Sequence, residues 1–328
     1  MVRHVVVIGA GLAGLVAAGE LRQHGIGVTV LDKGRGVGGR MATRRITAPD
    51  GRVAVFDHGA QFFTSRSDEF AEMVARWVDD GVVREWCRGF AGDDGHPRYV
   101  ATGGMASLAK HLARDVEVRT STLVFSVTPG DERSWRVTID DGTTIETDAV
   151  VCTCPLVQSY SILASSGLEL PAELMFTEYD RTIGLLAVFD RPTDVPAPGG
   201  VQNPDDVFSW IGDNVARGVS AVPAVTFHAN PAWSLEHWDR PTHELEHLLR
   251  AAAEPWSGTG SVSGSATIVA AEVKKWRFAT PRSIWPDPCL VAGDGSLVLA
   301  GDAFAGPKVE GAVMSGLAAA RQLLTRSG

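Results

Sequence analysis

Cysteine is scarce in this sequence. Cys87, Cys152, Cys154 and Cys289 are its four cysteines among 328 residues, too few for a disulfide framework and without the spacing of a zinc site. Cys152 and Cys154 stand two apart in an apolar run, so on a strand they would lie on one face. We interpret them as buried thiols rather than as a reactive pair.

The sequence also lacks an excess of lysine and arginine over aspartate and glutamate. The net charge is −9, and no basic run or tail stands out. Binding to nucleic acid needs a surface that neutralises phosphates, and docking on an anionic membrane needs a basic patch, so the charge argues against both. No stretch is long and apolar enough to span a bilayer. The composition, 45% hydrophobic and 21% charged, is typical of a globular protein with more than one small domain.

The first residues could be mistaken for a signal peptide. Arg3 and His4 precede an apolar stretch, as in the start of such a peptide. The same stretch carries glycines at nucleotide-binding spacing, and one segment cannot easily be both cleaved and the core of a binding site. We therefore expect a cytoplasmic protein.

Residues 4–31 have the order of elements of a dinucleotide site. The β-branched run from His4 to Ile8 predicts a strand buried on both faces, and an Ala-rich helix is predicted from Leu12 to about His24. Gly27 to Leu31 predicts a second strand that ends at Asp32, whose carboxylate can accept both hydroxyls of a ribose.

Three glycines lie between the first strand and the helix. Gly9 permits a tight turn, Gly11 lets the backbone approach a pyrophosphate, and Gly14 lets the helix pack closely on the strand. The N-terminus of the helix supplies N–H donors and partial positive charge for the phosphates. A second glycine-rich loop follows, in which Gly39 allows close approach and Arg40 can pair with a pyrophosphate oxygen.

These motifs, taken with later ones, resemble the FAD-dependent amine oxidase superfamily, and the renalase branch in particular. The resemblance extends over nearly the whole chain. The segments that carry it are Asp32-Lys33, Gly38-Gly39-Arg40-Met41, Asp57 to Phe62, Tyr99 to Met105, Phe227-His228, Leu235 to His237, Lys275 to Arg277, Leu299 to Asp302 and Val309 to Ala312. The first and last are specific to the superfamily, and those in the middle favour renalase.

The resemblance implies an α/β fold in two parts. The first is a Rossmann-type FAD-binding domain built from discontinuous segments, residues 1–65, 98–158 and 285–328. The second is a smaller α+β substrate domain with an antiparallel sheet, residues 66–97 and 159–284. The residues agree with this division, because Asp141-Gly142 predicts a hairpin between strands at 134–139 and 143–147.

The resemblance also implies which residues contact FAD. Val124 would offer its backbone to the adenine, Asp302 would accept from a ribityl hydroxyl, and a helix opening at Gly311 would direct its dipole at the flavin. No cysteine follows Cys289, so we expect the FAD to be non-covalent. The full set of assigned positions is Gly9, Gly11, Gly14, Asp32, Lys33, Gly39, Arg40, Met41, Gly59, Ala60, Gln61, Phe62, Val124, Gly301, Asp302, Val309, Glu310 and Gly311.

The protein would stack a flat substrate over the flavin, because the cofactor carries the chemistry. We expect His228, Trp276 and Gln61 to act in catalysis, and Phe62 and Phe227 to line the same face. A core position is an open alternative for His228 and Trp276.

Two substrate classes stay open. Renalase-like proteins oxidise isomeric 2- or 6-dihydronicotinamide forms of NAD(P), accept the hydride at flavin N5 and reduce O2 to H2O2. Amine oxidases of the wider superfamily take small primary or secondary amines, often with a lysine near N5, for which Lys274 and Lys275 are the candidates. A non-redox role for bound FAD is the third alternative.

Two further patterns are expected to be decoys. His243, Glu244 and His247 spell the zinc-protease signature, but on a helix the histidines fall opposite the apolar face of Leu245 and Leu249, so we predict no metal site. Residues 258–264 look like a second dinucleotide loop but follow a helix end, and we predict a flexible Gly/Ser loop.

Overall fold

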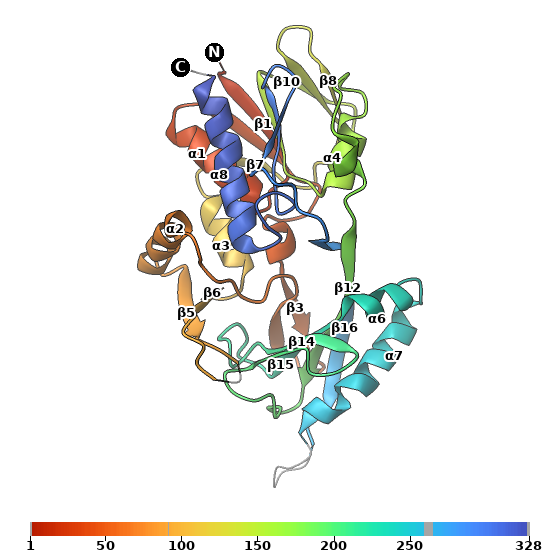
Figure 1. The fold of residues 1–328 in the computed structure, drawn as a ribbon. Coiled ribbons are helices and arrows are strands. Elements are labelled where there is room, and N and C mark those ends of the chain that lie inside the picture. The colour runs from red at the N-terminus through yellow and green to blue at the C-terminus, as the bar shows by residue number, and fades with distance from the viewer. Residues whose placement is uncertain (1, 91, 259–264, 327–328) are drawn as a thin grey trace.

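The computed structural model describes residues 2–90, 92–258 and 265–326. Figure 1 shows an upper part that contains both chain termini and a lower part built around a second sheet. Among the described residues no helix is both long enough and apolar enough to cross a membrane.

The upper part contains a six-stranded sheet in the order β17-β18-β11-β1-β2-β7. All neighbours are parallel except β17 and β18. The strands span Leu290–Ala292 (β17), Leu297–Leu299 (β18), Ala149–Cys152 (β11), His4–Ile8 (β1), Gly27–Leu31 (β2) and Glu117–Arg119 (β7). β1 lies at the centre and Val5, Val6 and Val7 have no exposed surface, as the unbroken apolar run predicted.

Helices cover one face of this sheet (Figure 1). They are α1 (Leu12–Gln23), α8 (Val309–Thr325) and α3 (Ala106–Leu112), with α2 (Asp68–Asp79) beside them. α1 and α8 touch backbone to backbone, because a Cβ on Gly316 would stand 2.2 Å from the Ala13 carbonyl oxygen. The apolar residues of α8, among them Val313 and Leu317, are buried in that contact.

The other face is covered by a three-stranded antiparallel sheet and two short helices. These are β8 (Val124–Pro129), β9 (Trp135–Ile139), β10 (Thr144–Thr147), α4 (Leu156–Leu163) and α5 (Ala172–Met175). In the β9–β10 hairpin, Thr138 pairs with Thr144 across the Asp141-Gly142 turn, so the predicted hairpin is confirmed. Val127 and Val137 share a core with Val6 and Ile8 of the central strand.

The lower part is a five-stranded antiparallel sheet in the order β13-β14-β15-β12-β16. Its strands are β13 (Gly200–Gln202), β14 (Phe208–Asp213), β15 (Ala224–Ala229), β12 (Tyr179–Phe189) and β16 (Ile268–Pro281). Helices α6 (Pro231–Glu236) and α7 (Thr242–Ala253) lie beside the sheet (Figure 1), and Leu245 and Leu249 of α7 are buried in its core.

A hairpin from the N-terminal segment packs on the same lower sheet. It consists of β3 (Thr43–Thr47) and β4 (Val53–Asp57), and Ala54 and Phe56 share a core with Leu186 and Val188 of β12. A second pair, β5 (Val83–Cys87) and β6 (Arg98–Ala101), joins segments that we assigned to different domains. The α/β fold with a parallel Rossmann-type sheet and antiparallel sheets is confirmed, whereas the domain boundaries stay a prediction.

His243 and His247 are exposed on α7, on the side away from buried Leu245 and Leu249, as the helical spacing predicted. The Gly/Ser stretch lies outside the described residues from 259 to 264.

Candidate active site

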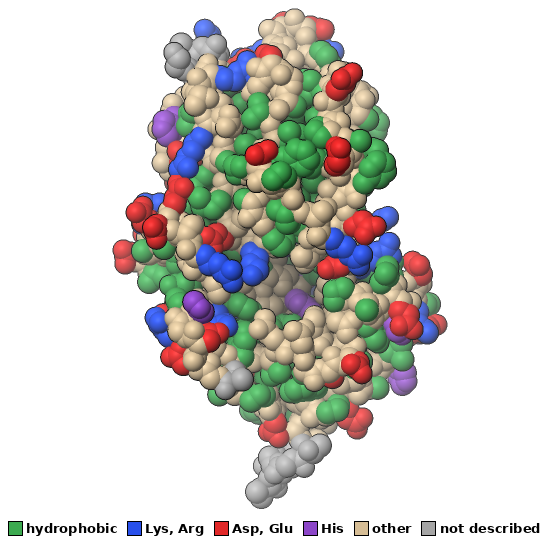
Figure 2. Space-filling model, in the orientation of Figure 1, with side chains coloured by type: hydrophobic (Ala, Val, Ile, Leu, Met, Phe, Trp, Pro, Cys, Tyr) green, Lys and Arg blue, Asp and Glu red, His purple; other side chains and the backbone are tan. Residues whose placement is uncertain are grey.

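A cavity of about 2250 Å³ runs between the upper and lower parts of the molecule. Small-molecule sites are usually about 300–1,000 Å³, so this cavity has room for a long cofactor and a second molecule. Figure 2 shows the hollow between the two parts, with a histidine inside it and lysines or arginines on both sides. All of the residues that we assigned to FAD line the cavity except Gly14 and Gln61.

The glycine-rich turn after β1 fits a pyrophosphate. Gly11 is the N-cap of α1 and lines the cavity, and a Cβ added to it would meet no protein atom within 4 Å. Packing within the protein therefore does not explain this glycine, whereas a ligand close to the helix N-terminus does. Gly14 has the predicted packing role, because its Cβ would stand 2.0 Å from the Gly9 carbonyl oxygen.

Asp32 joins the two glycine-rich loops at the end of β2. Its Oδ2 accepts from the Ala10 amide at 2.6 Å, and its Oδ1 accepts from the Gly34 amide at 2.6 Å. These bonds fix the carboxylate at the cavity wall next to Lys33, where we expect the adenosine ribose. Val124, assigned to the adenine, also lines the cavity.

Arg40 and Asp302 form a bidentate ion pair inside the cavity. Arg40 Nη1 donates to Asp302 Oδ2 at 2.5 Å, and Nη2 donates to Oδ1 at 2.6 Å. Arg40 Nη1 also contacts the carbonyl oxygens of Phe278 and Ala279 in β16. The pair therefore holds together the two groups expected at the pyrophosphate and the ribityl chain, and it ties them to the strand that carries Trp276.

The start of α8 and the segment before it form another part of the wall, where Val309, Gly311 and Gly301 line the cavity. The helix begins at Val309, two residues before the predicted start. The Glu310 carboxylate accepts from the Arg66 amide at 3.0 Å and from the Ser67 amide at 2.8 Å. It thereby connects α8 to the N-terminus of α2.

The lower wall contains three aromatic groups centred on His58. The His58 carbonyl oxygen accepts from Trp276 Nε1 at 2.7 Å and from His228 Nε2 at 3.1 Å. The His58 ring stacks on Trp276 with centroids 5.2 Å apart. All three residues line the cavity, and the expected place of His228 and Trp276 at the substrate face stays a prediction. His58 was missed, because nothing in the sequence separates it from its neighbours in the 57–62 segment.

Both imidazoles are neutral at pH 7. Burial, together with the nearby positive charges of Lys274 and Arg44, lowers the pKa of His58 to about 4. Burial also lowers the pKa of His228 to about 4, against the opposing effect of its bond to the His58 carbonyl. Since that carbonyl can only accept, His228 carries its proton on Nε2.

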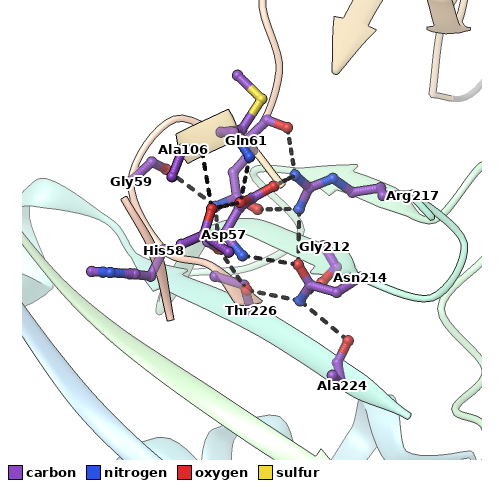
Figure 3. Close-up of polar contacts among 12 residues, drawn as sticks. Asp57, His58, Gly59, Gln61, Ala106, Gly212, Asn214, Arg217, Ala224 and Thr226 are labelled. Atoms are coloured by element: carbon purple, nitrogen blue, oxygen red, sulfur yellow. Dashed lines mark hydrogen bonds and ion pairs between the residues drawn. The ribbon is translucent and has the colours of Figure 1, made fainter. Parts of the chain in front are cut away.

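A buried polar network holds the segment that carries His58 (Figure 3). Asp57 and Arg217 are completely buried, and Arg217 Nη2 donates to Asp57 Oδ2 at 2.8 Å. Thr43 Oγ1 and the Met105 amide donate to Asp57 Oδ1, and Asn214 Oδ1 accepts from the Asp57 amide. Burial raises the pKa of Asp57, and the positive charge of Arg217 opposes this rise.

Gln61 is placed differently from the prediction. Its Oε1 accepts from Arg217 Nη1 at 2.7 Å and from Trp210 Nε1 at 3.1 Å, while its Nε2 donates to the Asp57 carbonyl at 2.7 Å. The side chain is 6% exposed and does not line the cavity. The expected catalytic position is therefore wrong, because a buried guanidinium needs acceptors and Gln61 supplies one.

Phe227 is the second correction. It is completely buried and packs on Phe208, with ring centroids 5.1 Å apart, on the side of the sheet that α7 covers. Successive residues of a strand point to opposite faces, so Phe227 and its neighbour His228 cannot both face the cavity. Phe62 does line the cavity and belongs to an aromatic cluster with Phe90 and Trp210.

Neither candidate lysine lines the cavity. Lys274 Nζ lies 3.1 Å from Glu272 Oε1, and Lys275 Nζ donates to the carbonyl oxygens of Trp238 and Arg240. The cysteines are free thiols. Cys152 is buried at the end of β11, whereas Cys154 follows the strand and is half-buried at the cavity wall.

Comparisons with known proteins show the family and a similar fold. Residues 74–324 match the family model for flavin containing amine oxidoreductase, and residues 7–77 match a NAD(P)-binding Rossmann-like domain. The PF1083 protein from Pyrococcus furiosus has a similar fold, with a TM-score of 0.60 and 14% identity over 98% of this chain and 97% of that one.

Two curated relatives share shorter stretches. Lysine-specific histone demethylase 1 homolog 1 of Arabidopsis thaliana is 42% identical over 31% of this chain and 11% of its own length. Acetone monooxygenase (methyl acetate-forming) of Gordonia sp. (strain TY-5) is 28% identical over 47% of this chain and 25% of its own length. The chain thus spans a quarter or less of either relative.

The Rossmann-type sheet and the cavity along it define a dinucleotide-binding class of protein. Within that class, the chain belongs to the flavin containing amine oxidoreductase family.

Proposed function

We propose that this chain is an FAD-dependent oxidase of the renalase type. Its substrates would be isomeric 2- or 6-dihydronicotinamide forms of NAD(P). When bound, FAD would accept the hydride at N5 and reduce O2 to H2O2. The residues that would hold it are those of the glycine-rich turn, Asp32, the Arg40–Asp302 pair and the start of α8.

The neutral aromatic wall is the observation that carries the proposal. His58, His228 and Trp276 present flat rings or ring edges to the cavity, and both histidines are uncharged at pH 7 because their pKa values are about 4. A dihydronicotinamide ring is flat and neutral, and it loses a hydride without first giving up a proton. Such a wall positions the ring and does not need to act as a base.

The carboxylates of the cavity disfavour a protonated amine. Within the described part of the chain, three carboxylates line the cavity: Asp32, Asp302 and Glu310. Each is already engaged, by backbone amides for Asp32 and Glu310 and by Arg40 for Asp302. An ammonium group would therefore meet no free negative partner.

A small primary or secondary amine is the second candidate, because the matching family model is that of amine oxidoreductases. Its weakness is the position of Lys274 and Lys275, which are engaged elsewhere and do not line the cavity. A cytoplasmic location also stays a prediction.

Aerobic turnover tests the proposal. The FAD-loaded protein is supplied separately with 2- and 6-dihydronicotinamide dinucleotides, ordinary 4-dihydro NAD(P)H and a panel of amines, and H2O2 is measured. We expect H2O2 with the isomeric dihydronicotinamides only. H2O2 with amines alone would overturn the substrate class.

A further inference from the structure

The cavity carries a positive charge that contrasts with the whole chain. The net charge of the protein is −9, yet ten lysines and arginines line the cavity beside only three carboxylates, among the residues that the structure describes. A cleft lined by one sign of charge attracts ligands of the opposite sign. The cations are Lys33, Arg35, Arg40, Arg44, Arg45, Arg66, Arg98, Lys110, Arg277 and Lys308.

Part of this charge is already accounted for. Arg40, Arg44 and Arg98 form ion pairs with Asp302, Glu272 and Asp94. Lys33 and Arg35 belong to the glycine-rich loop, beside the turn where FAD would place its own phosphates.

Arg66 and Lys308 are different, because they lie together at the junction of α2 and α8. Lys308 is the N-cap of α8, and the Glu310 carboxylate two residues later accepts from the Arg66 and Ser67 amides. The backbones of both cations are thus fixed to one junction. Their side chains are exposed, and in residues 2–90, 92–258 and 265–326 no ion pair to either is found.

This junction lies away from the turn that fits the pyrophosphate of FAD. α8 touches the beginning of α1 at Gly316, close to Ala13. α8 begins at Val309, seven residues before Gly316, which at 1.5 Å per residue is roughly 10 Å further along the helix. Arg66 also follows Phe62 closely in the chain, and the aromatic cluster of Phe62 borders the cavity.

We propose that Arg66 and Lys308 form an anion subsite that binds the pyrophosphate of a dinucleotide substrate. The inference rests on the proposed function and refines it. The two cations select the intact dihydronicotinamide dinucleotide over the phosphate-free dihydronicotinamide riboside and over amines. Arginine and lysine suit this task, since their donors match phosphate oxygens.

The test uses the FAD-loaded protein and the variants Arg66→Gln, Lys308→Gln and their combination. Arg76→Gln is the matched control, because Arg76 is an exposed arginine of α2 that does not line the cavity. KM and kcat are measured with the dihydronicotinamide dinucleotide and with the riboside. Binding of ADP-ribose, which carries the pyrophosphate without the reactive ring, is measured separately by calorimetry.

We expect each single variant to raise KM for the dinucleotide and the Kd of ADP-ribose roughly tenfold. For Arg66→Gln the riboside KM, the kcat values and the FAD content should stay unchanged, and the control should match the original protein. An unchanged KM and Kd in the double variant would overturn the subsite, as would an equal loss for dinucleotide and riboside. If no dihydronicotinamide is oxidised but ADP-ribose binding falls in the double variant, the proposed function fails and the subsite stands.

Discussion

Arg217 donates from Nη2 to Asp57 Oδ2 over 2.8 Å, and both side chains are completely buried. Asp57 ends the β3–β4 hairpin, whereas Arg217 follows β14 of the lower sheet, 160 residues later in the sequence. The residue after Asp57 is His58, whose carbonyl oxygen accepts from both His228 and Trp276. The buried pair thus fixes the segment from which the aromatic wall is built.

Loss of one member of the Arg217–Asp57 pair should destabilise the fold. We expect Arg217→Met to lower the free energy of unfolding by about 3–5 kcal/mol, because Asp57 would keep a buried charge without its partner. The double variant Asp57→Asn with Arg217→Met should lose less than the sum of the two single variants. Chemical denaturation of the FAD-loaded proteins measures all four values, and strictly additive losses would contradict the account.

Two glycines of the N-terminal turn should behave in opposite ways. Gly11→Ala should leave the apoprotein as stable as before, since the new methyl group meets no protein atom, but should weaken FAD binding at least about tenfold. Gly14→Ala should destabilise the fold itself by at least about 2 kcal/mol, because its methyl group overlaps the Gly9 carbonyl.

Thermal unfolding of the apoproteins and fluorescence titration with FAD separate the two effects. Apoprotein can be prepared by acid precipitation, since we expect the FAD to be non-covalent. Retention of the flavin in the acid pellet would show that this expectation is wrong. Normal FAD affinity in Gly11→Ala would remove the main reason for placing the pyrophosphate there.

Even a lysine in place of Arg40 should weaken FAD binding. Arg40→Lys keeps the charge but cannot make both hydrogen bonds to Asp302, so we expect the Kd for FAD to rise roughly tenfold. Arg40→Gln should raise it further. The same titration measures both, with Arg76→Gln as the control, and an affinity within twofold of the original protein would contradict the role.

Acid should destabilise the protein through its buried histidines. The pKa of His228 is about 4 in the folded protein and 6.5 when unfolded, so the unfolded chain takes up the proton first as the pH falls. The contribution of neutral His228 to the free energy of unfolding is complete above pH 6.5 and is lost between pH 6.5 and about 4. Over this window the free energy of unfolding falls by at most about 1.4 kcal/mol per pH unit. His58 adds a second loss in the same window.

His228→Gln removes one of these titrations while it keeps a donor for the His58 carbonyl. Its free energy of unfolding should therefore fall less steeply than that of the original protein across this window. Identical slopes would show that His228 is not a buried neutral imidazole.

The sequence predicts which residues line the glycine-rich end of the cavity, because the information for that end is local. Gly9, Gly11 and Asp32 act through turns and helix ends within one βαβ unit, and the Gly-Gly-Arg loop follows directly. Asp302 and the start of α8 also line the cavity and belong to the same kind of local motif.

The residues at the other end of the site cannot be predicted from local sequence in this way. Arg217 has no motif around it, and its partners Asp57 and Gln61 become neighbours only when the hairpin packs on the lower sheet. Gln61 was misplaced because its type suggests a polar group in a pocket, whereas the buried guanidinium is what it binds. Phe227 is separated from its neighbour His228 by strand alternation, which the sequence alone indicates.

Anaerobic reduction of the bound FAD tests the central claim most directly. One equivalent of 2- or 6-dihydronicotinamide dinucleotide is mixed with the FAD-loaded protein without O2, and the flavin absorbance is followed; amines are mixed in parallel. The account predicts complete bleaching by the dihydronicotinamides with formation of NAD(P)+, and none by the amines. Bleaching by amines alone, or a flavin that neither class reduces, would contradict it.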